Sequence, residues 1–253
     1  MNKRKIAIKL STLILVTLMV LIVLSVFATD IVLKSVYNKR DKNDLYWNYS
    51  KILEQPYKYL KIDGGNITNI IFEPGKKSSV RVLKQWWNFH ADSSINAYVK
   101  NDTLYLNLKF NNYKNINERD WMQGEVLVRL FGPQLLSVNG NNTNIELQKL
   151  QQSNITINLR GRSRLEVETY SHNFDTLKVA QQDSSQVVFE MSPDLTGSYM
   201  MHFNHVFAAL QGVTLLDIGR STIDDIKLNV ADSSAVILSG KSLKGITSNS
   251  FTK

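Results

Sequence analysis

The sequence predicts an all-β protein, specifically a parallel β-helix or solenoid preceded by a single N-terminal transmembrane helix. Three observations lead to this prediction. An uncharged, mostly aliphatic run lies near the N-terminus, the remaining chain alternates polar and apolar residues over short stretches, and similar corner sequences recur in its second half. A period of two is typical of strands, and a unit that recurs at a fixed spacing is typical of stacked coils.

The apolar run extends over residues 10–28 and follows a segment, residues 1–9, that contains four lysines and arginines. In a helix the run would span about 28 Å, which matches the hydrocarbon core of a bilayer. Because basic flanks stay on the cytoplasmic side, we expect a signal anchor with its N-terminus in the cytoplasm and its body in the periplasm or outside the cell. Val26-Phe27-Ala28 leaves open a cleaved signal and secretion, and a buried core helix is a third alternative.

On this basis the chain is expected to contain five segments. They are a short basic cytoplasmic tail (1–9), a transmembrane signal anchor in contact with membrane lipid (10–28), a connector (29–58), an exported β-helical domain (59–245) and a frayed tail (246–253). The connector alternates charged and apolar residues, so its first part is expected to continue the helix for a few turns.

The formal net charge is +8, but its distribution argues against a nucleic-acid partner. Four of the 30 basic residues flank the anchor, and the chain from Leu135 onward carries 10 basic and 11 acidic residues. A nucleic-acid surface needs a concentrated basic stripe. The residual excess, in residues 30–134, is interpreted as a solvated surface, with contact to anionic lipid or polysaccharide as the alternative.

The chain contains no cysteine. This excludes disulfides, thiolate zinc sites and cysteine nucleophiles. An exported domain of this kind must be held together by its apolar core and its backbone ladders, which suits a bacterial envelope.

Alternating apolar residues predict a series of strands in the first half of the body. Turn signals separate them, such as Asp63-Gly64-Gly65-Asn66, Glu73-Pro74-Gly75 and Lys100-Asn101-Asp102. The predicted strands lie near Tyr59–Ile62, Ile67–Phe72, Val80–Leu83, Tyr98–Lys100, Leu104–Leu108 and Val126–Leu130.

The second half of the chain resembles itself. Val179–Phe189 and Val230–Leu238 each place an Asp-Ser-Ser corner between two apolar strands. Apolar triplets at Leu136, Ile157 and Leu177 recur every 20–21 residues, which fits one coil of a solenoid. A β-sandwich is the alternative, but its strands usually lack a repeated corner chemistry.

Three stretches together resemble the auto-transporter adhesin head GIN domain family. They are Tyr59–Gly75 with the following Ser79-Val-Arg-Val, then Lys100–Leu108, and then Val126–Gly140. The resemblance covers roughly residues 59–240 and implies a parallel β-helical envelope domain of Bacteroidetes-type bacteria with no assigned catalysis. The chain departs from the family pattern in its long anchor and connector, at Trp86-Trp87, and in Met191–Gly212, which we expect to form an irregular coil or a loop excursion.

No catalytic residue, metal ligand or cofactor is predicted. Gly64-Gly65 is not followed by the Gly-Lys-Ser/Thr of a phosphate loop, and no Gly-x-Ser-x-Gly elbow occurs. His202 and His205 form the one histidine pair, and no carboxylate stands at a useful spacing in the sequence around them. They are interpreted as ordinary surface or core residues, with metal binding as the alternative.

Four residues are candidates for a ligand surface, namely Trp86, Trp87, Asp183 and Asp232. Exposed indole rings can stack on sugar rings, although packing in the core or in a dimer is the leading interpretation of the tryptophans. Asp183 and Asp232 occupy matching corners, where a carboxylate accepts backbone N–H bonds. Acid/base hydrolysis or Ca²⁺ binding, together with Asp224-Asp225, is the alternative.

These observations favour a membrane-anchored bacterial envelope protein whose exported domain is a non-catalytic surface for binding, adhesion or structure. The expected partners are membrane lipid through residues 10–28 and either an envelope glycan or another envelope protein. A β-helical carbohydrate-active enzyme acting on envelope or extracellular polysaccharide is the alternative function. It would require two or three carboxylates that converge in one groove.

Overall fold

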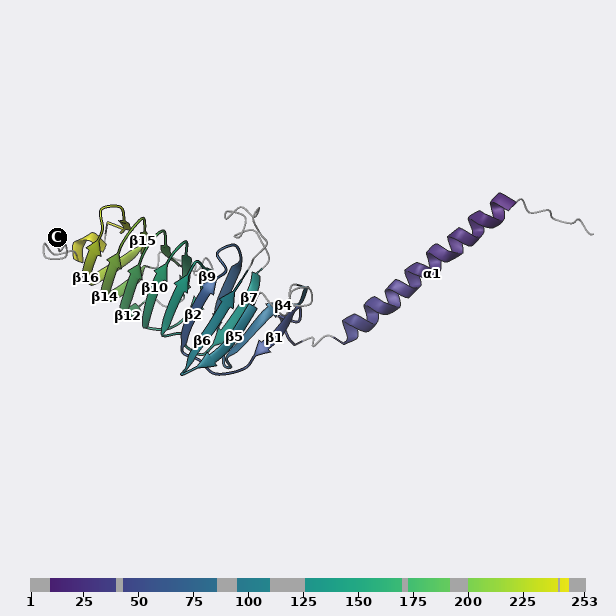
Figure 1. Cartoon of the computed structure of the whole chain (residues 1–253), viewed down its shortest axis with the longest axis horizontal. Coiled ribbons are helices and arrows are strands. Elements are labelled where there is room, and N and C mark those ends of the chain that lie inside the picture. Colours follow the sequence, from purple (N-terminus) through teal and green to yellow (C-terminus); the bar gives the residue numbers. More distant parts are fainter. Residues whose placement is uncertain are drawn as a thin grey trace, which may run out of the picture. The chain divides into compact units, whose positions relative to one another are not determined.

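The protein is mostly β with one N-terminal apolar helix, as the coarse features of the sequence predict (Figure 1). The computed structural model describes residues 10–39, 43–85, 95–109, 126–169, 173–191, 200–240 and 242–245. The chain divides into two compact units, Met1–Trp47 and Asn48–Lys253.

The first unit contains the helix α1, Leu10–Asn38, which is ten residues longer than the apolar run. None of its residues is buried in the protein. Its hydroxyl groups bond within the helix, as when Thr17 Oγ1 donates to the Leu13 carbonyl at 2.9 Å and Ser25 Oγ to the Ile22 carbonyl at 2.7 Å. A helix of this length and apolarity, with no protein surface against it, fits a signal anchor or a single membrane span.

The second unit is built mainly of strands. The strands are β1 (Tyr49–Leu53), β2 (Tyr59–Gly64), β3 (Asn69–Pro74), β4 (Ser79–Leu83), β5 (Ile95–Lys100), β6 (Thr103–Leu108), β7 (Val126–Gly132), β8 (Ser137–Asn141), β9 (Asn144–Leu150), β10 (Asn154–Arg160), β11 (Arg164–Thr169), β12 (Asn173–Gln181), β13 (Gln186–Met191), β14 (Met201–Leu210), β15 (Leu215–Asp217), β16 (Ser221–Val230) and β17 (Ala235–Ile237). The 3₁₀ helix η2 (Ser242–Gly245) follows them.

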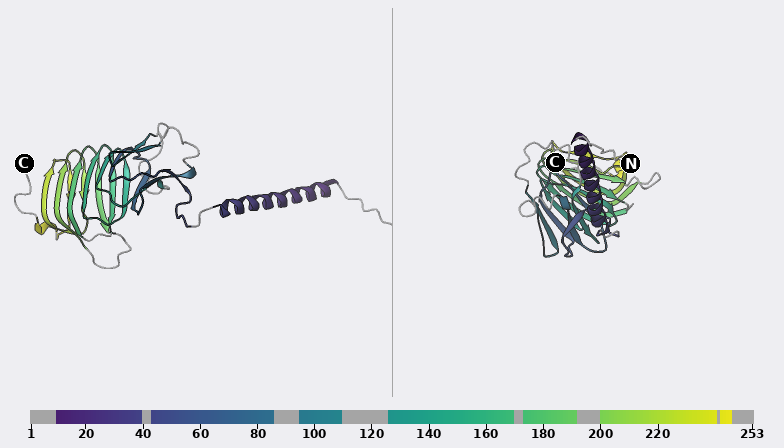
Figure 2. Two further views of the ribbon diagram at one scale, coloured as in Figure 1. Left: turned by 90° about the horizontal axis from the view of Figure 1, so that it is seen from below. Right: turned by 90° about the vertical axis from the view of Figure 1, so that its right-hand side faces the viewer.

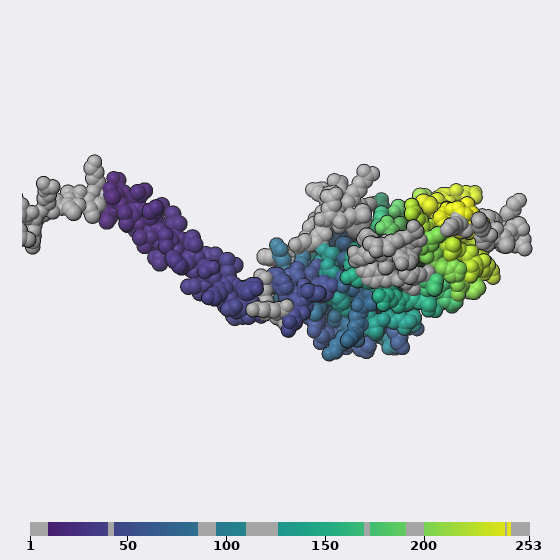
Figure 3. Space-filling view, turned by 180° about the vertical axis from the view of Figure 1, so that it is seen from behind, coloured from purple at the N-terminus to yellow at the C-terminus, as the bar shows by residue number. Residues whose placement is uncertain are grey.

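The strands form two sheets that share one apolar interior. Sheet A has nine strands in the order β1-β4-β7-β3-β9-β11-β13-β15-β17, and sheet B has eight in the order β16-β14-β12-β10-β8-β2-β6-β5. From β8 onward the chain alternates between the sheets, so each pair such as β8–β9 or β10–β11 makes one turn around the interior. Figure 2 shows these turns side by side, and Figure 3 shows the same succession of colours from behind.

Apolar side chains line up in columns because neighbouring strands pair in register. In sheet B, Val138, Ile157 and Val179 are direct partners on β8, β10 and β12, and all three are buried. In sheet A, Ile145, Leu165 and Val187 do the same on β9, β11 and β13. Each turn therefore buries its apolar residues against the turns on both sides, which gives one continuous core.

Both sheets are mixed, whereas the sequence predicted a parallel arrangement throughout. β1 pairs with β4, β4 with β7, and β5 with β6 in antiparallel fashion, and the other pairs are parallel. The β5–β6 pair is antiparallel because the two-residue turn Asn101-Asp102, with φ values of 49° and 56°, closes a hairpin. The sequence analysis identified this turn but not its hairpin geometry.

The order of turns in space also differs from their order in the chain. β2 lies between β6 and β8 in sheet B, and β3 lies between β7 and β9 in sheet A. The first turn of the chain, β2–β3, is therefore covered by the later β6–β7 turn. This insertion buries Leu60 of β2 between Leu104 of β6 and Val138 of β8.

Tyrosines fix the start of the β-rich unit. β1 lies within the segment expected to be a connector, and Tyr49 on it donates through its hydroxyl group to the Val126 carbonyl at 2.7 Å. The Tyr57 hydroxyl group donates to the Phe131 carbonyl at 2.8 Å. Burial raises the pKa of the Tyr57 phenol, so this group remains a donor over the whole physiological pH range.

The segment Met191–Gly212 was expected to interrupt the repeat, and that expectation is wrong for Met201–Leu210. β14 occupies Met201–Leu210 and pairs in parallel with β12 and β16 over its length. Residues 192–199 lie outside the described part of the chain. Strict alternation is broken in β14, because Asn204 and His205 are two consecutive residues that are not buried between the buried Phe203 and Val206.

Three phenylalanines fill the interior at the level of β12, β13 and β14. Phe174 and Phe203 stack with centroids 5.1 Å apart, and Phe189 meets Phe203 edge-on at 5.7 Å. All three rings are buried. Aromatic pairs in these geometries contribute beyond the area they bury.

We expect Phe203→Ala to destabilise the β-rich unit by about 3–5 kcal/mol, because it empties a space that neighbouring turns cannot fill. Phe207→Ala is the matched control, since this ring lies on the same strand but faces outward. The measurement is the urea midpoint, followed by far-UV circular dichroism. Equal shifts for both variants would contradict the assigned interior.

Candidate functional site

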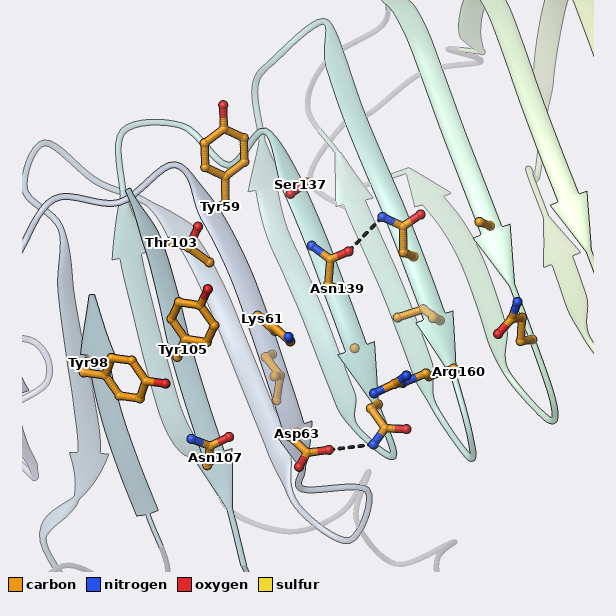
Figure 4. A pocket seen from close by; sticks show the side chains of 17 residues that line it. Tyr59, Lys61, Asp63, Tyr98, Thr103, Tyr105, Asn107, Ser137, Asn139 and Arg160 are labelled. Atoms are coloured by element: carbon orange, nitrogen blue, oxygen red, sulfur yellow. Dashed lines mark hydrogen bonds between the residues drawn. The ribbon is translucent and has the colours of Figure 1, made fainter. Parts of the chain in front are cut away.

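A hollow on the outer face of sheet B is the candidate site (Figure 4). Its volume is about 1010 Å³. We call it the tyrosine hollow, and its principal side chains are Tyr59, Lys61, Asp63, Tyr98, Thr103, Tyr105, Asn107, Ser137, Asn139, Asn141, Asn158, Arg160 and Gln182. They come from β5, β6, β2, β8 and β10, with Gln182 following β12.

Strand alternation places these side chains outside. On β2, Leu60 and Ile62 are buried, so Tyr59, Lys61 and Asp63 point the other way. Thr103, Tyr105 and Asn107 on β6 follow the same alternation. The backbone groups of these strands pair with neighbouring strands, so a ligand on this face would meet side chains only.

Two tyrosines and a lysine form a stack at one end of the hollow. The rings of Tyr98 and Tyr105 are nearly parallel, with centroids 5.0 Å apart. Lys61 Nζ lies 5.7 Å from the centroid of the Tyr105 ring. Tyr105 is therefore in contact on both sides, whereas Tyr98 and Tyr59 are 42% and 38% exposed and offer free ring area.

Side-chain amides form the floor of the hollow. Asn158 Nδ2 donates to Asn139 Oδ1 at 2.8 Å, and Asn141 Nδ2 donates to Asp63 Oδ1 at 2.6 Å. Each amide has both donors and acceptors, so these pairs leave further bonding capacity. Asn107 makes no side-chain bond with any residue that the structure describes.

The hollow contains a single carboxylate, that of Asp63. Glycoside hydrolysis ordinarily needs two carboxyl groups about 5–9.5 Å apart. Asp63 has no such partner among the residues that line the hollow, and one of its oxygens is engaged by Asn141. The arrangement is suited to binding hydroxyl-rich molecules rather than to hydrolysing them.

Of the four predicted ligand residues, the two that the structure describes, Asp183 and Asp232, do not line the hollow. Trp86 and Trp87 fall outside the described residues. Asp183 and Asp232 stand at equivalent corners, after β12 and after β16, and both are exposed. The corner at Gly212 lies between these two corners. On one side, Val213 N donates to the Asp183 carbonyl, and on the other side, Ser233 Oγ donates to the Gly212 carbonyl.

Asp183 is held by the backbone of the neighbouring turn. Its Oδ2 accepts from the Gly161 N–H at 2.9 Å. Its φ of 65° is a left-handed conformation that Asp and Asn adopt more readily than most residues. Asn142 has the same role two turns earlier, with a φ of 50° and its Oδ1 accepting from the Arg162 N–H at 3.0 Å.

The two histidines do have carboxylate partners, which the sequence analysis did not find. His202 Nε2 lies 3.2 Å from Asp224 Oδ2, and His205 Nδ1 lies 3.5 Å from Asp225 Oδ2. The partners are about 20 residues away in sequence but adjacent in space, because β14 pairs with β16. In the described part of the chain, no group of three or more metal-binding side chains occurs.

The aspartates required by the enzyme alternative do not converge. Asp224 and Asp225 lie near the start of β16, and Asp232 follows its end. At about 3.3 Å per residue, Asp225 is about 16 Å from Val230, where the strand ends. Asp183 follows β12, and its corner is two turns before the corner that contains Asp232.

Glutamates lie side by side on the outer face of sheet A. Glu146 on β9 is the direct neighbour of Glu166 on β11, and Glu168 is the neighbour of Glu190 on β13. Partial burial raises the pKa of Glu146, and the charges of Glu166 and Glu168 act in the same direction.

Sequence reasoning did not find the tyrosine hollow. The outward triplets Tyr59-Lys61-Asp63 and Thr103-Tyr105-Asn107 are visible as alternation in the sequence. Their adjacency is not, because it depends on β6 packing beside β2.

We expect Asp183→Ala to destabilise the β-rich unit by about 1 kcal/mol, because it removes the acceptor of the Gly161 N–H. Asp183→Asn keeps an acceptor and tolerates the same φ, so it should retain most of the stability. Asp232→Ala at the equivalent corner is the control and should have little effect on the urea midpoint. A negligible loss for Asp183→Ala would contradict the structural role.

We expect Glu146→Gln to stabilise the protein at neutral pH. The pKa of Glu146 is higher in the folded state than its ordinary value of 4.5. The free energy of unfolding of the parent therefore falls as the pH rises from 4.5 through the pKa of the folded state, whereas the glutamine of the variant carries no titratable group and the variant does not lose this stability. Parent and variant should therefore converge in thermal midpoint below pH 4.5 and diverge above it. Glu54→Gln is the control, because the neighbouring Lys51 lowers the pKa of Glu54 and its substitution should bring no gain at neutral pH. A Glu146→Gln effect that does not vary with pH would be inconsistent with this account.

Solved structures of similar fold come from Bacteroides and Parabacteroides. A "putative adhesin" from Bacteroides fragilis matches with a TM-score of 0.51 at 15% identity, over 75% of this chain and 76% of its own. A "putative adhesin" from Parabacteroides merdae matches with a TM-score of 0.49 at 15% identity, over 74% of this chain and 73% of its own. A "putative lipid binding protein" from Parabacteroides distasonis matches with a TM-score of 0.49 at 12% identity, over 74% and 80%.

No family model and no curated protein matches the chain. The likeness to the Bacteroides fragilis protein shows a shared fold.

Proposed function

We propose that this protein is a membrane-anchored envelope protein whose exported β-rich unit binds a glycan in the tyrosine hollow without catalysing a reaction. The observation that carries the proposal is the concentration of tyrosines, amides and hydroxyl groups on one hollowed sheet face. Hydroxyl groups of a sugar both donate and accept hydrogen bonds, as do these amides. Exposed tyrosine rings add apolar area with a polar tip.

A glycan suits this face better than a protein partner. Protein interfaces ordinarily have an apolar centre with a polar rim. The centre of the tyrosine hollow is instead made of Lys61 and the Asn139–Asn158 pair, and the aromatic groups lie at one end. An envelope protein as partner is therefore the second candidate.

Hydrolysis of a glycan is the alternative function, and the site favours binding. Asp63 is the one carboxylate in the hollow, and the aspartates at positions 183, 224, 225 and 232 are dispersed over the corner and the far end of sheet B. The adhesin names of the structural neighbours agree with a binding role.

We also propose that α1 anchors the protein with its N-terminus in the cytoplasm, and that the turns from β2 to β17 form a β-helix of the GIN domain type. The exposed apolar surface of α1 and the preceding basic residues support the anchor. The parallel pairing of the successive turns supports the β-helix. The antiparallel strands β1, β4 and β5 would then cover its N-terminal end.

We expect Tyr98→Ala and Asn107→Ala each to weaken glycan binding by about tenfold, which corresponds to about 1.4 kcal/mol. Tyr98 contributes exposed ring area, and Asn107 contributes an amide that bonds no described residue. The measurement is retention of the purified chain on a glycan array, followed by titration against the retained glycan.

Val213→Ala is the control, because this 68% exposed side chain lies at a corner away from the hollow. Unchanged binding in both hollow variants would refute the assigned site. Release of shortened sugars from the retained glycan would favour the enzyme instead.

A further inference from the structure

A second hollow continues the tyrosine hollow along sheet B. It has a volume of about 500 Å³ and includes Lys178 of β12, Phe207 of β14 and Lys227 of β16. We call it the basic hollow. Asn158 and Ala180 line both hollows, so the two form one continuous track.

The strand register explains the shape of the basic hollow. Lys178, Phe207 and Lys227 are direct neighbours in one row across three strands. The next outward row contains Ala180 and Ala209, whose small side chains leave space for the hollow above them. Lys227 Nζ lies 5.5 Å from the centroid of the Phe207 ring. The ring therefore separates two lysines whose strands are about 10 Å apart.

None of the described residues that line the basic hollow compensates its charge. No carboxylate lines it. Within the described residues, Lys178, Lys227 and Arg160 make no ion pair. Asp225, two positions from Lys227, lies beside His205 instead. The one carboxylate of the whole track, Asp63, is at the other end and accepts from Asn141.

The track is long and crosses the strands. It extends from β5 to β16 over eight adjacent strands, which corresponds to about 34 Å at about 4.8 Å per strand. Four cations, Lys61, Arg160, Lys178 and Lys227, are distributed along it. A single sugar would occupy only a small part of this length, whereas an extended chain would contact both hollows.

We propose that the ligand of sheet B is an extended anionic glycan, whose carboxylate or sulfate groups pair with Lys178 and Lys227 while its sugar rings lie in the tyrosine hollow. This inference rests on the proposed glycan-binding function and adds the chemical class of the glycan. A membrane-binding surface would present protruding apolar groups, whereas this track is lined mainly by amides, hydroxyl groups and cations.

The test compares charged and uncharged forms of one backbone. The full-length protein, in a polyoxyethylene detergent that carries no sugar, is titrated with polygalacturonate and with its methyl ester, and with dextran sulfate and dextran. Phosphatidylglycerol vesicles and poly-dT are the other polyanions. Each titration is repeated over a salt series, since ion pairs on an open face weaken as salt screens them.

We expect the charged form of at least one backbone to bind about tenfold more tightly than its neutral form. Lys178→Gln combined with Lys227→Gln should remove most of that difference and flatten the salt dependence. Lys76→Gln, an exposed lysine in the turn between β3 and β4 of sheet A, is the matched control and should change neither. Preference for polygalacturonate or for dextran sulfate identifies the anionic group.

Two results would overturn the inference, and only one of them would also overturn the proposed glycan-binding function. Equal binding of charged and neutral forms that still depends on Tyr98 would leave the glycan-binding function intact but end the anionic assignment. Failure to bind any polysaccharide would remove both, whether or not vesicles or poly-dT are retained.

Discussion

Each turn of the β-rich unit depends on the turns beside it. An isolated turn would expose the apolar face of both of its strands, and only parallel pairing in register lets successive turns bury these faces against one another. The columns through Val138, Ile157 and Val179 in sheet B and through Ile145, Leu165 and Val187 in sheet A are the result. The chain contains no cysteine, so no disulfide contributes to this stacking.

The same register controls the outside of the molecule. Because alternate residues point outward, every outward side chain lies next to its counterparts on the two neighbouring strands, and residues distant in sequence become a row. On sheet B these rows collect tyrosines, amides and four cations. On sheet A they bring Glu146 beside Glu166 and Glu168 beside Glu190, and partial burial, with the charges of Glu166 and Glu168 acting in the same direction, raises the pKa of Glu146. The two faces of one stack thereby acquire different binding properties.

The corners make the turns compatible with this register. Asn142 and Asp183 adopt positive φ values and use their side chains to satisfy N–H groups of the adjacent turn. At Gly212, with a φ of 80°, a Cβ atom would lie 2.7 Å from the Asp183 carbonyl oxygen, so the close approach of two corners requires glycine there. These residues act in the stacking of turns.

The sequence by itself determined the apolar N-terminal helix, the strand character of the body and most strand positions, because these follow from local hydrophobic periodicity. It also marked the corner residues, whose chemistry is local. It did not determine that β2–β3 lies inside β6–β7, that Asn101-Asp102 closes an antiparallel hairpin, or that His202 meets Asp224. Those outcomes, and the track from Tyr98 to Lys227, depend on which strands become neighbours. Only the tertiary structure decides this, since a strand's alternation specifies which side chains face outward but not which strand lies beside it.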